Sequence, residues 1–409
     1  MKIAIIGAGV AGVVTLKYAL ERGHECECFE ETGEFGGTWV YTDKTGVDEN
    51  GMKIYRTMYK DLITNLPKEV MFFLDFPYPE HIKESIITQP QVLQYLTDYV
   101  NKFDLEKHIK YHQTVVKVRP HNDDKWTVTT ENVINKTQNS KIYESVFVCN
   151  GHFRYPKLPN IDSRNLFNGL QMHSSDYRNQ NLYKNKRVLV IGASYSGIDV
   201  ANHIKSVTKK LCLSHWSPTN VKIESVVNKP AVSKMYPQGA VFADGTVEEF
   251  DIVIYCTGYE YKFPFLDDSC GITVNDNWVK PLYKHVINIE RPTMYFIGIP
   301  FLVAAFQCCD IQARFSLAAL EKKFVLPQKQ HMLKDLNDYE FELKKNNVPN
   351  RHTHKIGQRI VSYFAELAEI AAIRPIPNVY AKLYSYVISQ FGNQSKNYVI
   401  LNDEHFIVC

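Results

Sequence analysis

The N-terminal stretch decides the fold; residues 2–30 read KIAIIGAGVAGVVTLKYALERGHECECFE. The short apolar run Lys2–Ile6 is typical of a buried parallel strand. A glycine-rich turn follows, and then a helical pattern runs from Val13 to about Arg22. Gly23 ends that helix, and Glu25–Phe29 reads as the next strand. The stretch therefore predicts a βαβ motif at the very start of the chain.

The turn of this motif has the spacing G-x-G-x-x-G, with glycines at Gly7, Gly9 and Gly12. In a dinucleotide site the first glycine allows the tight turn, the second lets a pyrophosphate approach, and the third lets helix and strand pack closely. The helix N-terminus then faces the phosphates. Glu30 ends the second strand and is placed to bind ribose hydroxyls, which favours FAD or NAD over NADP. A chance glycine loop without a ligand is the weaker alternative, because strand, helix and acid all occur in place.

A second βαβ motif is predicted further along the chain. The apolar run Arg187–Ile191 leads into GASYSG at residues 192–197, a helical stretch Ile198–Lys209 and a strand Leu211–Ser214. A plain crossover without a ligand remains the alternative to a second nucleotide site. The residues that we expect to contact this nucleotide are Gly192, Ser194, Tyr195, Ser196, Gly197 and His215.

The second loop differs from the first in two ways. Ser194 replaces the central glycine, but it keeps the backbone amide and adds only a small hydroxyl. His215 and Trp216 follow the second strand, where the first motif has Glu30. The lack of an acid fits a ligand with a 2′-phosphate, which an acid would repel. The two loops together predict two nucleotides bound at once, which is the arrangement for hydride transfer from NADPH to FAD.

Composition excludes several other classes of protein. The 409 residues include 47 Lys and Arg against 44 Asp and Glu, a net charge of +3, which argues against a nucleic-acid partner. Nine cysteines without a C-x-x-C predict neither a disulfide framework nor a metal site, nor the dithiol of a flavin disulfide reductase. No apolar run is long enough for a membrane span. We expect a soluble, cytoplasmic protein, or a secreted one if a signal peptide has been removed, and homo-oligomerisation stays open.

Between the two motifs, residues 167–177 read FNGLQMHSSDY and match F-x-G-x-x-x-H-x-x-x-Y. This pattern resembles the fingerprint of flavin-containing monooxygenases. Four further stretches are similar to that family: Gly36–Trp39, Tyr59–Pro77, Cys256–Tyr259 and Gln312–Arg314. The chain looks most like the soluble insect members, which include N-oxygenases of pyrrolizidine alkaloids. Family members often have glycine at Ser194 and arginine at Trp216, so the preference for NADPH stays open, with His215 or Lys205 as substitutes.

The resemblance implies an α/β fold with two Rossmann-like dinucleotide-binding domains, the NADP domain inserted into the FAD domain. We expect the FAD domain over residues 1–163 and 287–409, including a C-terminal helical and loop region, and the NADP domain over 165–286. The helix that returns the chain to the FAD domain should begin near Asp310. Tyr177, the last residue of the fingerprint, is expected to contact NADP. The further residues expected to contact FAD are Gly37, Thr38, Trp39, Thr64 and Gln312.

The resemblance also implies the chemistry. NADPH reduces FAD, O₂ then gives a C4a-hydroperoxyflavin, and a soft nitrogen or sulfur atom of an amine or thioether takes the distal oxygen. Asn65 matches the asparagine beside the flavin and is the one candidate catalytic residue; the alternative is that it only caps a turn before Pro67. Other readings are a Baeyer–Villiger monooxygenase, disfavoured by Tyr177 in place of tryptophan, an NADPH oxidase, and a flavin-binding interaction scaffold.

Overall fold

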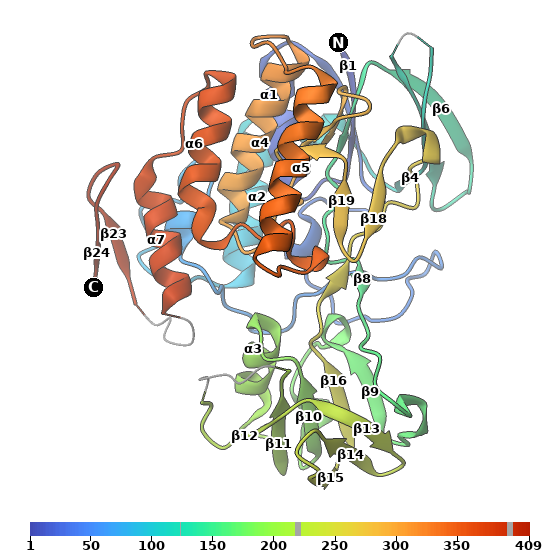
Figure 1. The fold of residues 1–409 in the computed structure, drawn as a ribbon, viewed down its shortest axis with the longest axis vertical. Coiled ribbons are helices and arrows are strands. Elements are labelled where there is room, and N and C mark those ends of the chain that lie inside the picture. Colours follow the sequence, from blue (N-terminus) through green and yellow to red (C-terminus); the bar gives the residue numbers. More distant parts are fainter. Residues whose placement is uncertain (123, 217–221, 391–395) are drawn as a thin grey trace. The chain divides into compact units, whose positions relative to one another are not determined.

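Both predicted βαβ motifs form in the computed structural model, which is shown in Figure 1. The structure describes residues 1–122, 124–216, 222–390 and 396–409. In each motif the two strands are parallel neighbours. The first motif consists of β1 (Lys2–Ile6), α1 (Val10–Glu21) and β2 (Glu25–Phe29), and the second of β10 (Arg187–Ile191), α3 (Tyr195–Ile204) and β11 (Lys210–Ser214).

Both helices begin earlier than the apolar pattern predicted. Gly9 and Ser194 are the N-cap residues, so the last glycine of each loop lies inside the first helical turn. α3 also ends before the predicted Lys209. The amides of Val207 and Thr208 both donate to the Ile204 carbonyl oxygen, at 3.1 and 3.2 Å, and these contacts close the helix.

The chain divides into two compact units, and the second is inserted into the first. Unit 1 comprises Met1–Val40, Ile63–His152 and Tyr261–Cys409, and unit 2 comprises Tyr41–Leu62 and Phe153–Glu260. These limits differ from the boundaries at 163, 165 and 286 expected from the sequence. Residues after 260 return to unit 1 early, because their apolar side chains join its core. The assignment of FAD to unit 1 and NADP to unit 2 stays a prediction.

Unit 1 is built on a mixed sheet in which β1 lies between β2 and β7, parallel to both. The sequence of neighbours is β20 (Leu282–Tyr283), β21 (Ile287–Asn288), β22 (Met294–Phe296), β7 (Ser145–Val148), β1, β2 and β3 (Ile109–Lys110).

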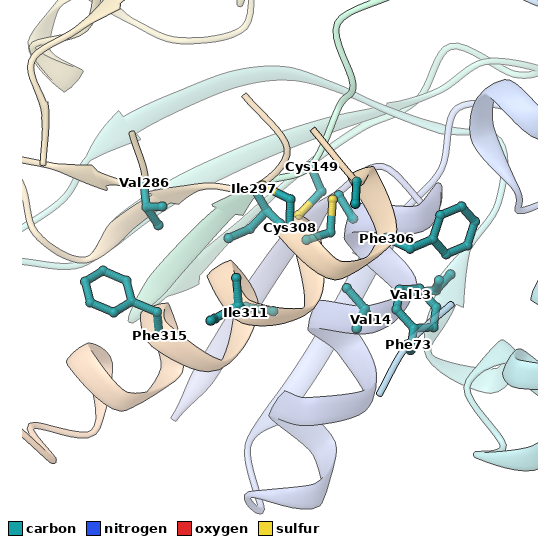
Figure 2. Close-up of a cluster of buried hydrophobic side chains, with 14 of the residues drawn as sticks. Val13, Val14, Phe73, Cys149, Val286, Ile297, Phe306, Cys308, Ile311 and Phe315 are labelled. Carbon is teal, nitrogen blue, oxygen red and sulfur yellow. The ribbon is translucent and has the colours of Figure 1, made fainter. Parts of the chain in front are cut away.

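The helices of unit 1 enclose its larger core. α4 (Ala305–Leu320) packs along α1, and Figure 2 shows Val13 and Val14 of α1 beside Phe306 and Ile311 of α4. α4 is buried on almost every side and begins at Ala305, well before the predicted Asp310. Each such apolar side chain stabilises the fold by about 1.5–3 kcal/mol relative to exposure. The other helices are α2 (Gln89–Lys102), α5 (Lys329–Lys345), α6 (Ile360–Ala371) and α7 (Asn378–Ser389).

A second core in unit 1 joins the sheet to an antiparallel meander. Phe29 of β2 meets Tyr143 of the meander edge to face, with ring centroids 6.2 Å apart. The meander consists of β4 (Gln113–Pro120), β5 (Trp126–Asn132) and β6 (Gln138–Tyr143), and two hairpins complete the unit: β18 (Thr273–Asn275) with β19 (Trp278–Lys280), and β23 (Tyr398–Ile400) with β24 (Phe406–Val408).

Unit 2 has a parallel sheet of its own, with β10 at its centre. Its neighbours run β12 (Val227–Lys229), β11, β10, β16 (Ile252–Tyr255) and β9 (Leu170–His173). Beside it lie an antiparallel sheet of β13 (Val232–Tyr236), β14 (Gly239–Phe242) and β15 (Val247–Glu249), and the short pair β8 (Tyr155–Pro156) and β17 (Tyr259–Glu260). Over the described ranges of both units, no helix is long and apolar enough to cross a membrane.

A pair of histidines, the buried His354 and the half-buried His285, ties the C-terminal part of unit 1 to its sheet. The Nδ1 atoms of His285 and His354 lie 2.9 Å apart, and the Val279 amide donates to His354 Nε2 at 3.0 Å. Since Nε2 accepts, His354 carries its proton on Nδ1, and this N–H donates a hydrogen bond to Nδ1 of His285. Burial lowers the pKa of His354 to about 3 and the pKa of His285 well below its ordinary value. The pair is therefore stable only while both rings are neutral.

We predict that unfolding becomes easier by about 2 kcal/mol per histidine of this pair when the pH falls from 7 to 5. The unfolded chain takes up protons below about pH 6.5, whereas the folded rings stay neutral; the stability is complete above that pH and lost as the pH falls. In His354→Gln the amide oxygen can still accept from the Val279 amide. The free energy of unfolding of this variant, measured by chemical denaturation, should therefore drop by about 2 kcal/mol less between pH 7 and pH 5 than that of the wild type. The same change at exposed His331 is the control, and an undiminished pH dependence in His354→Gln contradicts the assignment.

Candidate functional site

The shape of the first glycine loop is set by close contacts between backbone atoms of the loop and of the end of β2. The Gly7 amide donates to the Phe29 carbonyl oxygen at 2.8 Å, and Gly7 adopts a φ of +100°, which favours glycine. A Cβ added at Gly12 would lie 1.8 Å from the Gly7 carbonyl oxygen. These two glycines are needed by the protein itself, because they bring α1 against the end of β1.

Gly9 is different, because the protein itself has room for a side chain there. Gly9 has a φ of −80°, and a Cβ would meet only the Gly37 backbone, at 3.4 Å from its Cα. Gly37 faces it from the short helix Gly37–Trp39, with a φ of +57°. The N-terminus of α1 carries neither a side-chain cap nor an acid in its first turn. Bare backbone at both positions, together with the helix dipole, fits a pyrophosphate.

Glu30 lies at the end of β2, next to this loop. Its Oε2 accepts from the Ala8 amide at 3.0 Å, and its Oε1 accepts from the amide and hydroxyl of Thr32 at 3.0 and 2.8 Å. Burial raises the pKa of this carboxyl group. A carboxylate offers about four acceptor positions, so these contacts leave one for a ribose hydroxyl. The fold thus brings Gly7, Gly9, Gly12, Gly37 and Glu30 together around one place that suits FAD.

Of the remaining predicted FAD residues, Thr38 and Trp39 belong to the same short helix as Gly37. The Trp39 ring packs beside Phe306, with centroids 6.4 Å apart. Thr64 is buried and exchanges two hydrogen bonds with Ile87: its amide donates to the Ile87 carbonyl at 2.8 Å, and its hydroxyl accepts from the Ile87 amide at 3.1 Å. Thr64 therefore fixes the backbone of this segment.

Asn65 follows that anchored residue directly. Its side chain is half-buried, and among the described residues it makes no hydrogen bond. The short helix Lys68–Val70 that follows has Pro67 as its N-cap. Asn65 is therefore not a helix cap, and its amide can still both donate and accept.

Gln312 lies in the middle of α4, not at a helix start as the sequence suggested. The side chain is completely buried. Its Oε1 accepts from the Gly298 amide at 2.9 Å, and its Nε2 donates to the Tyr363 hydroxyl at 2.7 Å. Both ends of the amide are thus used inside unit 1, and a direct contact with FAD stays a prediction.

The second glycine loop repeats the construction of the first. The Gly192 amide donates to the Ser214 carbonyl at 2.8 Å, and a Cβ at Gly197 would lie 1.7 Å from the Gly192 carbonyl oxygen. Ser194 is exposed and extended at the N-cap, and Tyr195 and Ser196 form the first turn, which contains no acid. This arrangement leaves the helix N-terminus open to an anion.

The residues directly after β11 are His215 and Trp216, and neither is an acid. His215 is half-buried, and its amide donates to the Lys229 carbonyl at 3.2 Å. Lys229 itself pairs with Glu248 at 3.0 Å, while the Trp216 side chain is 91% exposed. The predicted role of His215 beside a 2′-phosphate stays a prediction.

The fingerprint residues hold unit 2 together. Tyr177 is completely buried, and its hydroxyl lies 2.6 Å from Nδ1 of His203 on α3. His173 Nε2 donates to the Gly258 carbonyl at 3.0 Å while its Nδ1 accepts from the Ser175 amide at 3.1 Å. Burial lowers the pKa of His173 to about 4, so it is neutral near pH 7. A direct contact between Tyr177 and NADP stays a prediction, but its hydroxyl fixes the helix behind the second loop.

One contributor to unit 2 was missed from the sequence. The Tyr59 hydroxyl donates to the Asp199 carboxylate of α3, and its ring lies edge to face with Tyr177, with centroids 5.2 Å apart. Burial raises the pKa of Asp199. No motif marks this pair; only an acid on the buried face of an amphipathic helix could have suggested a partner.

Comparison with known proteins agrees with this arrangement. The family model described as flavin-binding monooxygenase-like matches residues 1–224 and 213–385. Senecionine N-oxygenase of Tyria jacobaeae is 34% identical over 99% of this chain and 91% of that protein. A flavin-containing monooxygenase of Arabidopsis thaliana, FMO GS-OX1, is 33% identical over 92% of this chain and 86% of its own.

Among solved structures, S-allyl-L-cysteine S-oxygenase from Allium sativum superposes with a TM-score of 0.89 at 31% identity. The match covers 95% of this chain and 92% of that one. With two nucleotide loops, a fitting FAD cradle and relatives aligned over nearly the whole length, the chain belongs to the flavin-binding monooxygenase-like family and is a monooxygenase that uses FAD and NADPH.

Proposed function

We propose that this chain oxygenates the nitrogen of a tertiary amine of the pyrrolizidine-alkaloid type, with FAD bound by unit 1 and NADPH by unit 2. The observation that carries the substrate class is the similarity to senecionine N-oxygenase over 99% of the chain. Oxygenation of a thioether sulfur is the second candidate, favoured by the similarity to S-allyl-L-cysteine S-oxygenase. Both atoms are soft nucleophiles with a free lone pair.

In unit 1, the paired backbones of Gly9 and Gly37 receive the FAD pyrophosphate, and Glu30 accepts a hydrogen bond from a ribose hydroxyl. Thr38, Trp39 and Thr64 border the same cofactor. FAD held there and reduced by NADPH would activate O₂, one atom of which would go to the substrate while the other left as water. The protein holds this cofactor and keeps water away from it.

In unit 2, the backbone amides between Gly192 and Gly197 and the open N-terminus of α3 receive the pyrophosphate of NADPH. Ser194 adds a hydroxyl donor, and His215 is positioned past β11, where a 2′-phosphate would lie. Asn65 faces the reacting region and hydrogen-bonds there through its unengaged amide.

We place the reaction in the cytoplasm. All nine cysteines are free thiols, and eight of them are buried. Free thiols of this number fit a reducing compartment, in which disulfides are rare. Fractionation of cells that produce the protein, followed by blotting, checks this placement.

Gly9→Ala should fold normally and lose FAD. The added methyl group fits beside Gly37 but occupies the place of the pyrophosphate. Gly12→Ala is the matched comparison, because its methyl group would overlap the Gly7 carbonyl and destabilise the fold itself. Flavin absorbance per protein and circular dichroism, measured on both purified variants, separate the two effects. A yellow, fully active Gly9→Ala protein contradicts the FAD assignment.

Asn65→Ala should retain FAD and still oxidise NADPH, but release peroxide in place of product. Without the Asn65 amide, the reacting region loses a hydrogen-bond donor. Removal of one such donor typically lowers the rate of the catalysed step about a hundredfold. Product and peroxide formed per NADPH consumed are the measurements. Wild-type coupling in this variant removes Asn65 from the chemistry, and Asn168→Ala, in unit 2, serves as the control substitution.

The substrate class is tested by offering the holoenzyme senecionine, S-allyl-L-cysteine and cyclohexanone in turn. We expect the amine to give its N-oxide with close to one product per NADPH, and the ketone to give none. Faster conversion of the thioether supports S-oxygenation as the main activity. Lactone from cyclohexanone supports the Baeyer–Villiger alternative, and NADPH oxidation to peroxide with every compound supports an oxidase.

A further inference from the structure

The segment between β22 and α4, residues 297–304, is held in place by other parts of unit 1. The Ile297 amide donates to the Val148 carbonyl at 3.0 Å, and the Ile299 carbonyl accepts from the Tyr261 hydroxyl at 2.5 Å. Further along, the Phe301 amide donates to the His354 carbonyl at 3.1 Å. These contacts fix a connection that has no regular secondary structure of its own.

Two side chains, the buried Gln312 and the half-buried His152, hold the two successive peptide groups that flank the Gly298 Cα. The Gly298 amide donates to Gln312 Oε1, and the Gly298 carbonyl accepts from His152 Nδ1; both distances are 2.9 Å. Burial lowers the pKa of His152 to about 4, so its ring is neutral and carries its proton on Nδ1. Gly298 has a φ of +84°. Glycine populates positive and negative φ about equally, so these side chains select the conformation.

Gly298 lies beside the first nucleotide loop. A Cβ added to it would be 3.8 Å from the Ala11 Cβ and 3.3 Å from the Cys309 Sγ. Ala11 belongs to the first turn of α1, two residues after Gly9. The backbone of Gly298 is thus fixed next to the first turn of α1, where the glycine loop ends.

We propose that Gln312 is a positioning residue for FAD: with His152 it fixes the backbone on both sides of Gly298, which forms a wall of the FAD site beside the first turn of α1. This inference rests on the proposed binding of FAD to unit 1, and it replaces a direct contact between Gln312 and the cofactor. The hydrogen bond from Gln312 to Tyr363 then stabilises unit 1 without contributing to the FAD site.

Three variants of the full chain separate positioning from stability. Gln312→Met keeps the volume and loses the acceptor for Gly298, so the apoprotein should bind added FAD about tenfold more weakly, as expected for one buried hydrogen bond. Gln312→Glu keeps an acceptor and should restore the affinity to within about twofold. Tyr363→Phe removes the acceptor for Gln312 Nε2 and the hydrogen bond that the hydroxyl donates to the Lys284 carbonyl at 3.0 Å, but it leaves the acceptor for Gly298 in place, so it should lower Tm without changing FAD affinity. Flavin fluorescence quenching gives the dissociation constants, and the visible spectrum of bound FAD reports its environment.

Wild-type FAD affinity and spectrum in Gln312→Met overturn the inference, as does an equal loss in Tyr363→Phe. If Gln312→Met does not fold, His152→Phe decides, because it removes the donor to the Gly298 carbonyl, on the other side of the same residue, and should weaken FAD binding likewise. The Gly9→Ala protein keeps the two proposals apart. If it loses FAD while the Gln312 and His152 variants do not, the FAD site stands and only the positioning role fails.

Discussion

Both units depend on one close approach, in which the last glycine of each loop lies against the carbonyl of the first. An added Cβ would come within 1.8 Å at Gly12 and 1.7 Å at Gly197. This approach aligns each helix with its strand and directs its uncapped N-terminus to the carboxyl end of the sheet. Every proposed contact to a phosphate follows from that alignment. The repetition explains how one chain can hold two nucleotides on unrelated stretches of sequence.

The strands and the loops were predictable because their signals are local. Apolar runs, glycine spacing and the acid Glu30 all lie within about thirty residues, and the observed strands match them closely. The starts of the two helices were not predictable from the apolar pattern. Gly9 and Ser194 are the N-cap residues, whereas the apolar pattern begins about one turn after them. α4 was placed too late for a related reason: a helix buried on all sides shows no amphipathic period to mark its start.

The parts that escaped prediction depend on contacts between distant residues. Segment 41–62 belongs to unit 2 through Tyr59 and Asp199, and nothing near Tyr59 in the sequence indicates this partner. Gln312 was predicted to contact FAD because the stretch Gln312–Arg314 resembles the family. Its position in α4 instead makes it a hydrogen-bond partner of Gly298 and Tyr363. The predicted glycines and Glu30 do meet, since the topology of a βαβ motif brings its loop and its strand end together.

The distribution of the thiols has a consequence for an enzyme that handles O₂. Burial raises the pKa of Cys256 and of Cys309 to about 12 and shifts the pKa of Cys149 and Cys308 in the same direction. Peroxide attacks the thiolate, and these groups remain almost entirely protonated at neutral pH. Cys409 alone is exposed. Oxidant that escapes from an unproductive turnover therefore meets almost no thiolate in this interior, so the buried thiols of the catalyst resist oxidation by its own side product.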